Sequence, residues 1–433
     1  MNIPAKAIGA PEAPRTTAQL GISPTLQREI LIKTMFRRSL DSVTEIAAAL
    51  SVTVPIAQDL IDRARELKLI ETLGASRLDE TKELRFQLTD AGRRLAQDAL
   101  AQSEYYGAMP VPLLDYEKQV RRQSIRNAAV SREDLASSFS NLIIADEMFE
   151  QLGPAVNASR SILMYGPPGN GKSSLANAIC AAYHDAVYVP HFLEYGGNVI
   201  AVFDPLIHRE IKNGDEEGAS LRLASASHDP RYVLCYRPTV ITGGELTLDM
   251  LDLSYNPVSR TYQAPLQLKS AGGVFIVDDL GRQVASPQAL VNRWIVPMEH
   301  GYDILTLQSG QKFTVPFDTK VVFSTNFPPS KIFDKAALRR IYYKIYVGNP
   351  GREVFVRIFV STAKRYPIEF SEEVLMYLLT KKYPTVDNEY AAFHAPFLIE
   401  QMIAACAYHG EPARMSIPLV DAAWEHLFIR EGE

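Results

Sequence analysis

From residue 24 to about residue 102, apolar residues recur with the spacing of helices. The first predicted helix places four apolar residues close to one face, at positions 26, 30, 31 and 35. VTEIAAAL at 43–50 predicts a second helix, and Pro55 lies near the first turn of a third. This part of the chain is therefore expected to be mainly helical, with a core made by one face of each helix.

Two alternating segments and another helix follow in the same region. Residues 70–88 predict a strand, a turn and a second strand, and Thr89 or Asp90 is placed to cap the next helix. Three helices with a two-stranded wing resemble a winged helix-turn-helix domain, which we expect at 24–102.

The charge of this region bears on whether it binds DNA. Between residues 25 and 100, twelve basic and twelve acidic residues leave no net charge. The segment expected to act as a recognition helix carries Asp59, Asp62 and Glu66, which DNA phosphates would repel. The balance favours contact with a protein, and contact with DNA is the alternative.

Farther along, short apolar runs predict strands that are buried on both faces of a parallel sheet. These runs lie at 162–165, at 274–277 and within TKVVFSTNF at 319–327. Alternating segments also predict hairpins around Gly196-Gly197-Asn198, between Tyr255 and Tyr262, and across Ser309-Gly310. Strands and helices that alternate in this way indicate an α/β fold.

Composition adds limits to the class of protein. A chain of 433 residues suggests several domains, and its net charge of −5 gives no global argument for nucleic acid or membrane surfaces. Cys180, Cys235 and Cys406 are too far apart for a disulfide framework or a zinc motif. No apolar run approaches the roughly 18 residues of a membrane span, and no signal segment is recognised, so a cytoplasmic protein without a membrane partner is expected.

The stretch SILMYGPPGNGKSS at 161–174 carries the clearest chemistry. It matches G-x-x-x-x-G-K-[ST] between a strand and a helix, which is the setting of a phosphate-binding loop. Its glycines let backbone N–H groups turn toward phosphate oxygens, its lysine supplies a cation, and its serine hydroxyl is a ligand for Mg²⁺. The residues predicted to bind ATP are Gly166, Pro167, Pro168, Gly169, Asn170, Gly171, Lys172, Ser173 and Ser174.

Three later segments offer the remaining parts of this chemistry. Asp278 and Asp279 follow the run at 274–277, at the sheet edge where α/β proteins bind ligands. The first carboxylate is expected to hold Mg²⁺, and the second to orient or deprotonate the attacking water. Asn326 follows another strand and can place that water, while Arg339 and Arg340 end a helix from which an arginine can reach a neighbouring subunit.

In this order the segments resemble the Walker A, Walker B, sensor 1 and arginine finger motifs of the AAA+ ATPases, over roughly 136–433. The resemblance implies a five-stranded parallel sheet, a helical lid and a ring, usually of six subunits, with ATP between neighbours.

In the family's terms Ser173 and Asp278 serve Mg²⁺, Asp279 stands where the base does and Asn326 is sensor 1. Arg339 or Arg340 is the finger, with Arg340 slightly favoured. The domains expected are a disordered tail at 1–23, a winged-helix domain at 24–102, a linker at 103–135, an AAA+ α/β domain at 136–348 and a helical lid at 349–433.

Two hairpins suggest the subgroup with a pre-sensor-1 hairpin, which includes MoxR-type chaperones and bacterial enhancer-binding activators. Tyr255 and Tyr262 either project into a central pore or, as is more common, pack across their hairpin.

Two positions depart from the family. Asp279 replaces the usual Glu and is one methylene shorter, which would slow hydrolysis, and Phe397 stands where a sensor 2 arginine is expected.

The leading hypothesis is an oligomeric ATPase that uses ATP and Mg²⁺ to remodel a protein partner, with the winged-helix domain choosing that partner. Two alternatives remain, an ATP-controlled DNA-binding regulator and a nucleotide-gated scaffold that hardly hydrolyses ATP. His191, Asp204 and His208 lie close in sequence, but their spacing matches no metal site, so turn and surface roles are expected.

Overall fold

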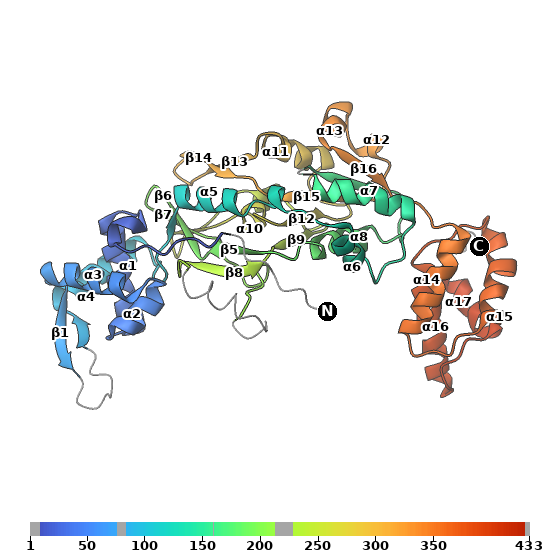
Figure 1. The fold of residues 1–433 in the computed structure, drawn as a ribbon, viewed down its shortest axis with the longest axis horizontal. Helices are drawn as coiled ribbons and strands as arrows, with labels where there is room; N and C mark the ends of the chain where they lie inside the picture. Colours follow the sequence, from blue (N-terminus) through green and yellow to red (C-terminus); the bar gives the residue numbers. More distant parts are fainter. Residues whose placement is uncertain (1–8, 76–83, 159, 213–227, 429–433) are drawn as a thin grey trace. The chain divides into compact units, whose positions relative to one another are not determined.

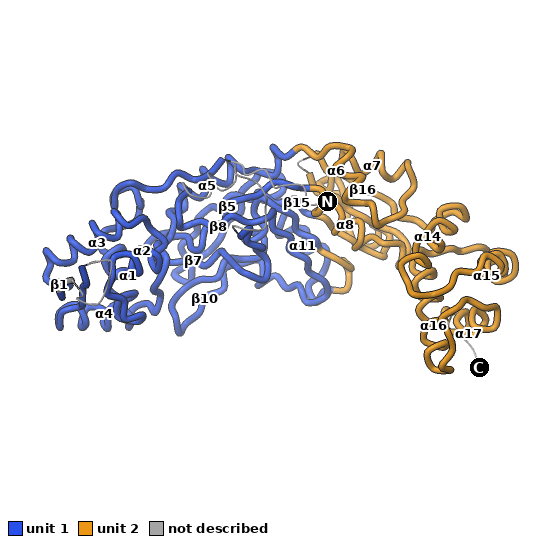
Figure 2. Tube along the Cα trace, turned by 60° about the horizontal axis from the view of Figure 1, so that its bottom comes forward, with its two compact units in different colours: residues 1–128, 183–276, 283–321 blue, residues 129–182, 277–282, 322–433 orange. Residues whose placement is uncertain are grey.

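The structure is a computed structural model that describes residues 9–75, 84–158, 160–212 and 228–428. The chain forms two compact units, which are coloured separately in Figure 2. Unit 1 contains residues 1–128, 183–276 and 283–321, and unit 2 contains residues 129–182, 277–282 and 322–433. The domain boundaries expected from the sequence stay predictions.

The helices at the start of unit 1 form as the apolar spacing predicts (Figure 1). The elements are α1 (Pro24–Arg38), α2 (Val43–Leu50), α3 (Val54–Glu66), the antiparallel strands β1 (Ile70–Ala75) and β2 (Leu84–Leu88), and α4 (Asp90–Gln102). Side-chain oxygens of Ser23, Ser42 and Thr89 cap α1, α2 and α4. Ile30 and Ile46 are fully buried in the core that these helices share. The turn predicted between the two strands lies outside the described residues.

Residues 9–23 are ordered, so the prediction of a disordered tail over 1–23 is wrong for them. Thr17–Leu20 form a 3₁₀ helix, and Leu20 and Ile22 are buried in the same core as α1. The Gln27 side chain donates to the carbonyls of Thr17 and Ile22. Two buried apolar residues are too few to make a periodic pattern, so the sequence does not indicate their burial. Residues 1–8 lie outside the described chain.

The rest of unit 1 consists mainly of hairpins and short sheets. One sheet has the strand order β10-β11-β7-β6-β3, with β10 (Ser254–Asn256), β11 (Thr261–Gln263), β7 (Asn198–Ala201), β6 (Phe192–Tyr195) and β3 (Val111–Pro112). Two antiparallel pairs are β5 (Ala186–Pro190) with β8 (Tyr232–Tyr236), and β13 (Tyr302–Thr306) with β14 (Lys312–Pro316). The helices are α5 (Leu113–Arg122), α10 (Leu266–Lys269) and α11 (Pro287–His300), with 3₁₀ turns at Ile125–Asn127 and Leu248–Leu251. All three predicted hairpins are confirmed.

Two sequence expectations concern side chains in these hairpins and turns. Tyr255 and Tyr262 pair across their hairpin with ring centroids 4.9 Å apart, and the buried Tyr262 hydroxyl accepts a hydrogen bond from the Gln308 backbone at 3.0 Å. This packing supports the structural role for the two tyrosines. His208 binds the backbone of Asp204 and lies 2.8 Å from the Lys269 carbonyl. Among the described residues, no group of three His, Cys, Asp or Glu is arranged to hold a metal ion.

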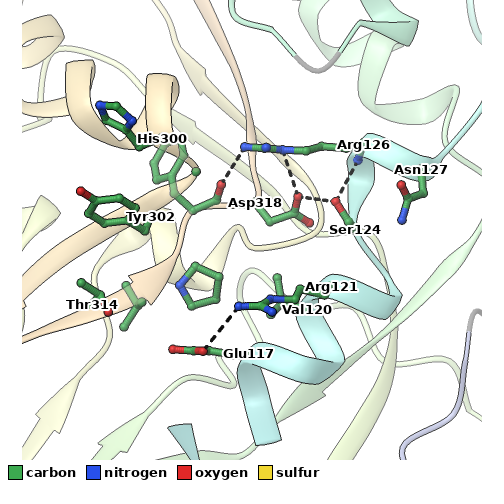
Figure 3. Close-up of a pocket in the computed structure, with 14 residues that line it drawn as sticks. Glu117, Val120, Arg121, Ser124, Arg126, Asn127, His300, Tyr302, Thr314 and Asp318 are labelled. Atoms are coloured by element: carbon green, nitrogen blue, oxygen red, sulfur yellow. Dashed lines mark hydrogen bonds and ion pairs between the residues drawn. The ribbon is translucent and has the colours of Figure 1, made fainter. Parts of the chain in front are cut away.

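The stretch expected to be a linker is partly built into unit 1. Tyr116 and Val120 of α5 are buried. Just after this helix, the Asp318 carboxylate accepts hydrogen bonds from the Ser124 hydroxyl at 2.6 Å and the Ile125 backbone at 3.1 Å. These contacts lie beside an open cavity of about 590 Å³, shown in Figure 3. The residues up to 128 therefore pack as part of a core rather than as a free connector.

The predicted α/β architecture is confirmed by a five-stranded parallel sheet. Its order is β16-β4-β15-β12-β9, with β16 (Tyr343–Tyr346), β4 (Ile162–Tyr165), β15 (Lys320–Thr325), β12 (Val274–Val277) and β9 (Thr239–Thr242). The strand β4 pairs in parallel with β15 on one side and β16 on the other. The order places the strand before the phosphate loop beside β15, which ends just before Asn326, and β12, which ends just before Asp278, is next. Strands that run in one direction bring these ends to one sheet edge.

The remaining helices belong to unit 2. They are α6 (Arg132–Ser138), α7 (Asp146–Asn157), α8 (Lys172–Ala181), α12 (Pro329–Ile332), α13 (Lys335–Arg340), α14 (Arg352–Arg365), α15 (Glu372–Tyr377), α16 (His394–His409) and α17 (Ile417–Leu427). Between α15 and α16 lie a π-helical turn at Leu378–Lys382 and a 3₁₀ turn at Tyr383–Val386. Helices α14 to α17 share an apolar core that includes Phe355, Leu398 and Trp424 (Figure 1).

In the described chain, no single helix is both long and apolar enough to cross a membrane; α2 and α3 meet the length and composition test only as a pair bent by 106°.

Candidate functional site: a phosphate loop beside two aspartates

The phosphate loop connects β4 to α8 and lies within unit 2. Gly169 and Gly171 have left-handed φ angles of 77° and 81°, as the motif predicts. Gly171 is also the N-cap of α8, so the positive end of that helix faces the loop. Gly166 has a φ of 142°, and a Cβ at this position would lie 2.3 Å from the Val347 carbonyl oxygen. The loop therefore needs glycine both for its turns and for its close packing.

Lys172 lies inside this loop and is only 5% exposed. Its ammonium donates hydrogen bonds to the carbonyls of Gly166 at 3.0 Å and Pro167 at 2.8 Å. Burial lowers the pKa of Lys172, and the nearby carboxylates of Asp279 and Asp278 oppose this shift. The ammonium thus lies against two carbonyls of the loop, and its role in binding phosphate stays a prediction.

Ser173 and Asp278, the two predicted magnesium ligands, are brought together. The Ser173 hydroxyl donates to Oδ2 of Asp278 at 2.6 Å. Ser173 is exposed and Asp278 is half-buried, so both oxygens are accessible from solvent. A hydroxyl and a carboxylate are hard oxygen donors, and Mg²⁺ in phosphate-binding sites takes one or two protein ligands together with substrate oxygens and waters. The pair fits this ion.

Asp279 and Asn326 form a second pair at the same sheet edge. The Asn326 amide donates to Oδ1 of Asp279 at 2.7 Å, which brings the predicted base and the predicted sensor residue into direct contact. The Asp279 backbone is left-handed, with a φ of 48°. Aspartate and asparagine adopt this conformation more readily than other residues with a side chain. This backbone geometry was not predicted from the sequence.

Arg339 and Arg340 form the last turn of α13, where Asp334 caps the other end of the helix. Both arginines are exposed. Such a position suits a side chain that acts on another subunit, but the role of either arginine as a finger stays a prediction.

The C-terminal helices of unit 2 contact the phosphate loop at a point that the sequence does not predict. The Phe393 backbone donates to the Gly169 carbonyl at 2.9 Å, and a Cβ on Gly169 would lie 2.1 Å from the Phe393 ring. The Asn170 side chain accepts from the Ala392 backbone at 3.1 Å and donates to the side chain of Asn349 at 2.7 Å. No local motif marks these residues, because the contact depends on the tertiary position of a segment far along the chain.

A cavity of about 390 Å³ opens beside this contact. Its lining is largely apolar and includes Ile143, Leu175, Ile358, Phe393 and Pro396 next to the loop glycines. Small-molecule sites have volumes of this order and are lined mainly by apolar and aromatic side chains. Phe397, at the position where a sensor 2 arginine is expected, packs against the core of the C-terminal helices, and sensor 2 stays unassigned.

Residues 351–426 match a family model described as a domain of unknown function, DUF8689. No curated protein matches the chain. A solved structure of NtrX from Brucella abortus in complex with ATP is similar with a TM-score of 0.40 and 14% identity, covering 78% of this chain and 64% of that chain. A mutant of RuvB from Thermotoga maritima is similar with a TM-score of 0.36 and 13% identity, covering 70% of this chain and 73% of that chain. Likeness at these TM-scores carries no conclusion about the function of this chain.

Proposed function

We propose that this protein binds ATP with Mg²⁺ and hydrolyses its terminal phosphoanhydride bond. The observation that carries the proposal is the pair of contacts beside the phosphate loop. Ser173 meets Asp278 at 2.6 Å, and Asp279 meets Asn326 at 2.7 Å. One pair supplies oxygen ligands for a metal, and the other supplies a carboxylate with an amide to orient a water.

Each residue group of this site has a defined role in the proposed reaction. The loop backbone and the Lys172 ammonium bind the β- and γ-phosphates, and the apolar cavity beside Leu175 and Phe393 takes the base. Ser173 and Asp278 hold Mg²⁺, which neutralises charge that develops on the phosphate oxygens. Asp279 accepts a proton from the attacking water, and Asn326 fixes the direction of its carboxylate.

The test of ATP hydrolysis is phosphate release by the purified chain and by Lys172→Ala. Removal of the loop ammonium should abolish turnover, whereas Lys118→Ala, which changes an exposed lysine paired with Asp115, should keep the rate of the unchanged chain. Equal rates for the chain and Lys172→Ala would refute the enzymatic proposal. Measurable ATP binding with turnover that is absent under single-turnover conditions would favour a nucleotide-gated scaffold.

We further propose that the active form is an oligomer of the AAA+ type, in which an exposed arginine of one subunit acts on ATP held by the next. Arg339 and Arg340 are exposed at a helix end, as this role needs. Arg339→Ala/Arg340→Ala should bind ATP but lose turnover. A mixture of this variant with Lys172→Ala should regain activity, because each supplies the part that the other lacks. No recovery in mixtures shown to contain both chains would refute action between subunits.

A protein partner is proposed for the N-terminal helices, and their surface supports this choice. Four apolar side chains of this region are about half exposed: Val54, Leu67, Leu73 and Leu84. On α3, Asp59 and Asp62 are already paired with Arg63 and Arg65, which leaves little basic surface for phosphate. A salt-dependent shift of duplex DNA by the full chain would favour the alternative, a DNA-binding regulator.

A further inference from the structure

A second cavity lies within unit 1 and has a volume of about 540 Å³. One wall comes from α1 and the end of α4, and the other from the hairpins β6–β7 and β10–β11. The two walls are joined by a hydrogen bond from the Glu104 backbone to the Ser259 carbonyl at 3.0 Å, and by Tyr105 and Phe192, whose ring centroids lie 4.7 Å apart. The proposed ATPase chemistry makes no use of this cavity.

Lys33 of α1 is the unusual residue in its lining. It is 2% exposed, and its ammonium donates a hydrogen bond to the Ser103 carbonyl at 3.1 Å. In the described part of the chain, no carboxylate lies within ion-pair distance of it; Glu29, one turn earlier, acts only through its longer-range field. An ammonium has three donors, and burial of a charge is costly unless it is paired. Burial accordingly lowers the pKa of Lys33.

Arg260 lines the same cavity from the β10–β11 hairpin. Its backbone is left-handed, with a φ of 51°, and its guanidinium donates to the Gln102 carbonyl at 3.3 Å. Lys33 and Arg260 thus both bind carbonyls at the C-terminal end of α4, which attracts cations. Capping of α4 accounts for their hydrogen bonds to carbonyls, but it does not account for a cavity that both cations line.

The charge and the volume of the cavity together indicate the kind of molecule that it can bind. Two cations, Lys33 and Arg260, against one carboxylate, Glu29, leave one net positive charge on its wall. Its volume lies in the range of small-molecule sites, well above what a single water needs. Tyr255 and Asn198 add an aromatic face and an amide to the lining.

We propose that this cavity is a binding site for a small molecule that carries an anionic oxygen group, either a phosphate or a carboxylate. Lys33 and Arg260 bind the anionic group, and the hairpin side chains contact the rest of the molecule. The site is separate from the phosphate loop, so the proposal holds whether or not the chain hydrolyses ATP.

The test uses the full chain carrying Lys172→Ala, so that the phosphate loop does not contribute. Thermal unfolding is followed against increasing sodium phosphate or sodium succinate at constant ionic strength. A bound anion should raise the unfolding midpoint in a saturable way, and Lys33→Met should abolish the rise. Arg260→Gln, at an exposed position, should weaken the apparent affinity at least about tenfold through loss of a charge-assisted hydrogen bond. Lys118→Met is the matched control and should behave like its parent.

Comparing phosphate with succinate distinguishes the two kinds of ligand that could supply the anionic oxygen group. A saturable rise with phosphate alone identifies a phosphorylated ligand, and a rise with succinate alone identifies a carboxylate. If neither anion raises the midpoint, or if the rise persists in both Lys33→Met and Arg260→Gln, the proposal is overturned. Should Lys33→Met fail to fold, the result with Arg260→Gln decides.

Discussion

Removal of the Asn326 amide tests whether Asp279 is positioned by its neighbour. Asn326→Ala deletes a hydrogen bond of 2.7 Å to a carboxylate, and such bonds contribute about 1.5–3 kcal/mol. If that energy holds Asp279 in its reactive orientation, the rate falls between about 10- and 150-fold. Because Asp279 is exposed and water can replace the amide, the lower end of this range, about tenfold, is expected.

The assay is steady-state phosphate release over a range of ATP concentrations. Asn326 contacts the carboxylate rather than the phosphate loop, so kcat should fall while KM for ATP changes less than about twofold. Asn256→Ala is the matched control, because the Asn256 side chain accepts hydrogen bonds from the backbone of Val258 and Ser259 in a surface turn. A raised KM with unchanged kcat would show that Asn326 serves ATP binding and would refute the positioning argument.

Three other changes have defined outcomes. Ser173→Ala removes the partner of Asp278, so half-maximal activity should need at least about tenfold more Mg²⁺ in a magnesium titration; an unchanged requirement would remove Ser173 from the metal site. Gly166→Ala forces a Cβ to 2.3 Å from the Val347 carbonyl and should lower the unfolding free energy by about 1–3 kcal/mol in denaturant titrations, whereas wild-type stability would contradict the close packing. Burial lowers the pKa of His394 from 6.5 to about 4, so the unfolded chain takes up a proton first as pH falls. Stability of the C-terminal helices should therefore be full above pH 6.5 and decrease toward pH 4, by at most about 3 kcal/mol. This loss should be absent in His394→Gln when Trp424 fluorescence is followed in a Trp294→Phe background, and an equal loss in that variant would assign it to other groups.

The parts of the site that could be predicted are those whose residues lie at strand ends. The glycine-rich loop, Asp278 and Asn326 each follow a short apolar run, and parallel strands necessarily bring such ends to one edge. The hydrogen bonds Ser173–Asp278 and Asp279–Asn326 confirm that these residues meet. The local pattern was enough to predict this part of the site, because a residue that follows a strand of a parallel sheet must lie at the same edge as the residues that follow the other strands.

The parts that could not be predicted depend on tertiary packing alone. Phe393 and Ala392 reach the phosphate loop across more than two hundred positions of sequence, and nothing in their local pattern indicates that contact. Leu20 and Ile22 order a segment of otherwise polar and small residues by packing into a core built from other helices. Lys33 is part of an ordinary helical pattern, and only the fold shows that it is buried.

The backbone conformation at Asp279 limits which residues can replace it during evolution. With a φ of 48°, the position accepts aspartate, asparagine or glycine at little cost, whereas glutamate meets a left-handed penalty of about 1–2 kcal/mol. A lineage that lengthened this acid would need a second substitution to relax the 278–282 turn. Exchange to asparagine needs no such help, so under the proposed function a single substitution at this position would give a protein that binds ATP without hydrolysing it.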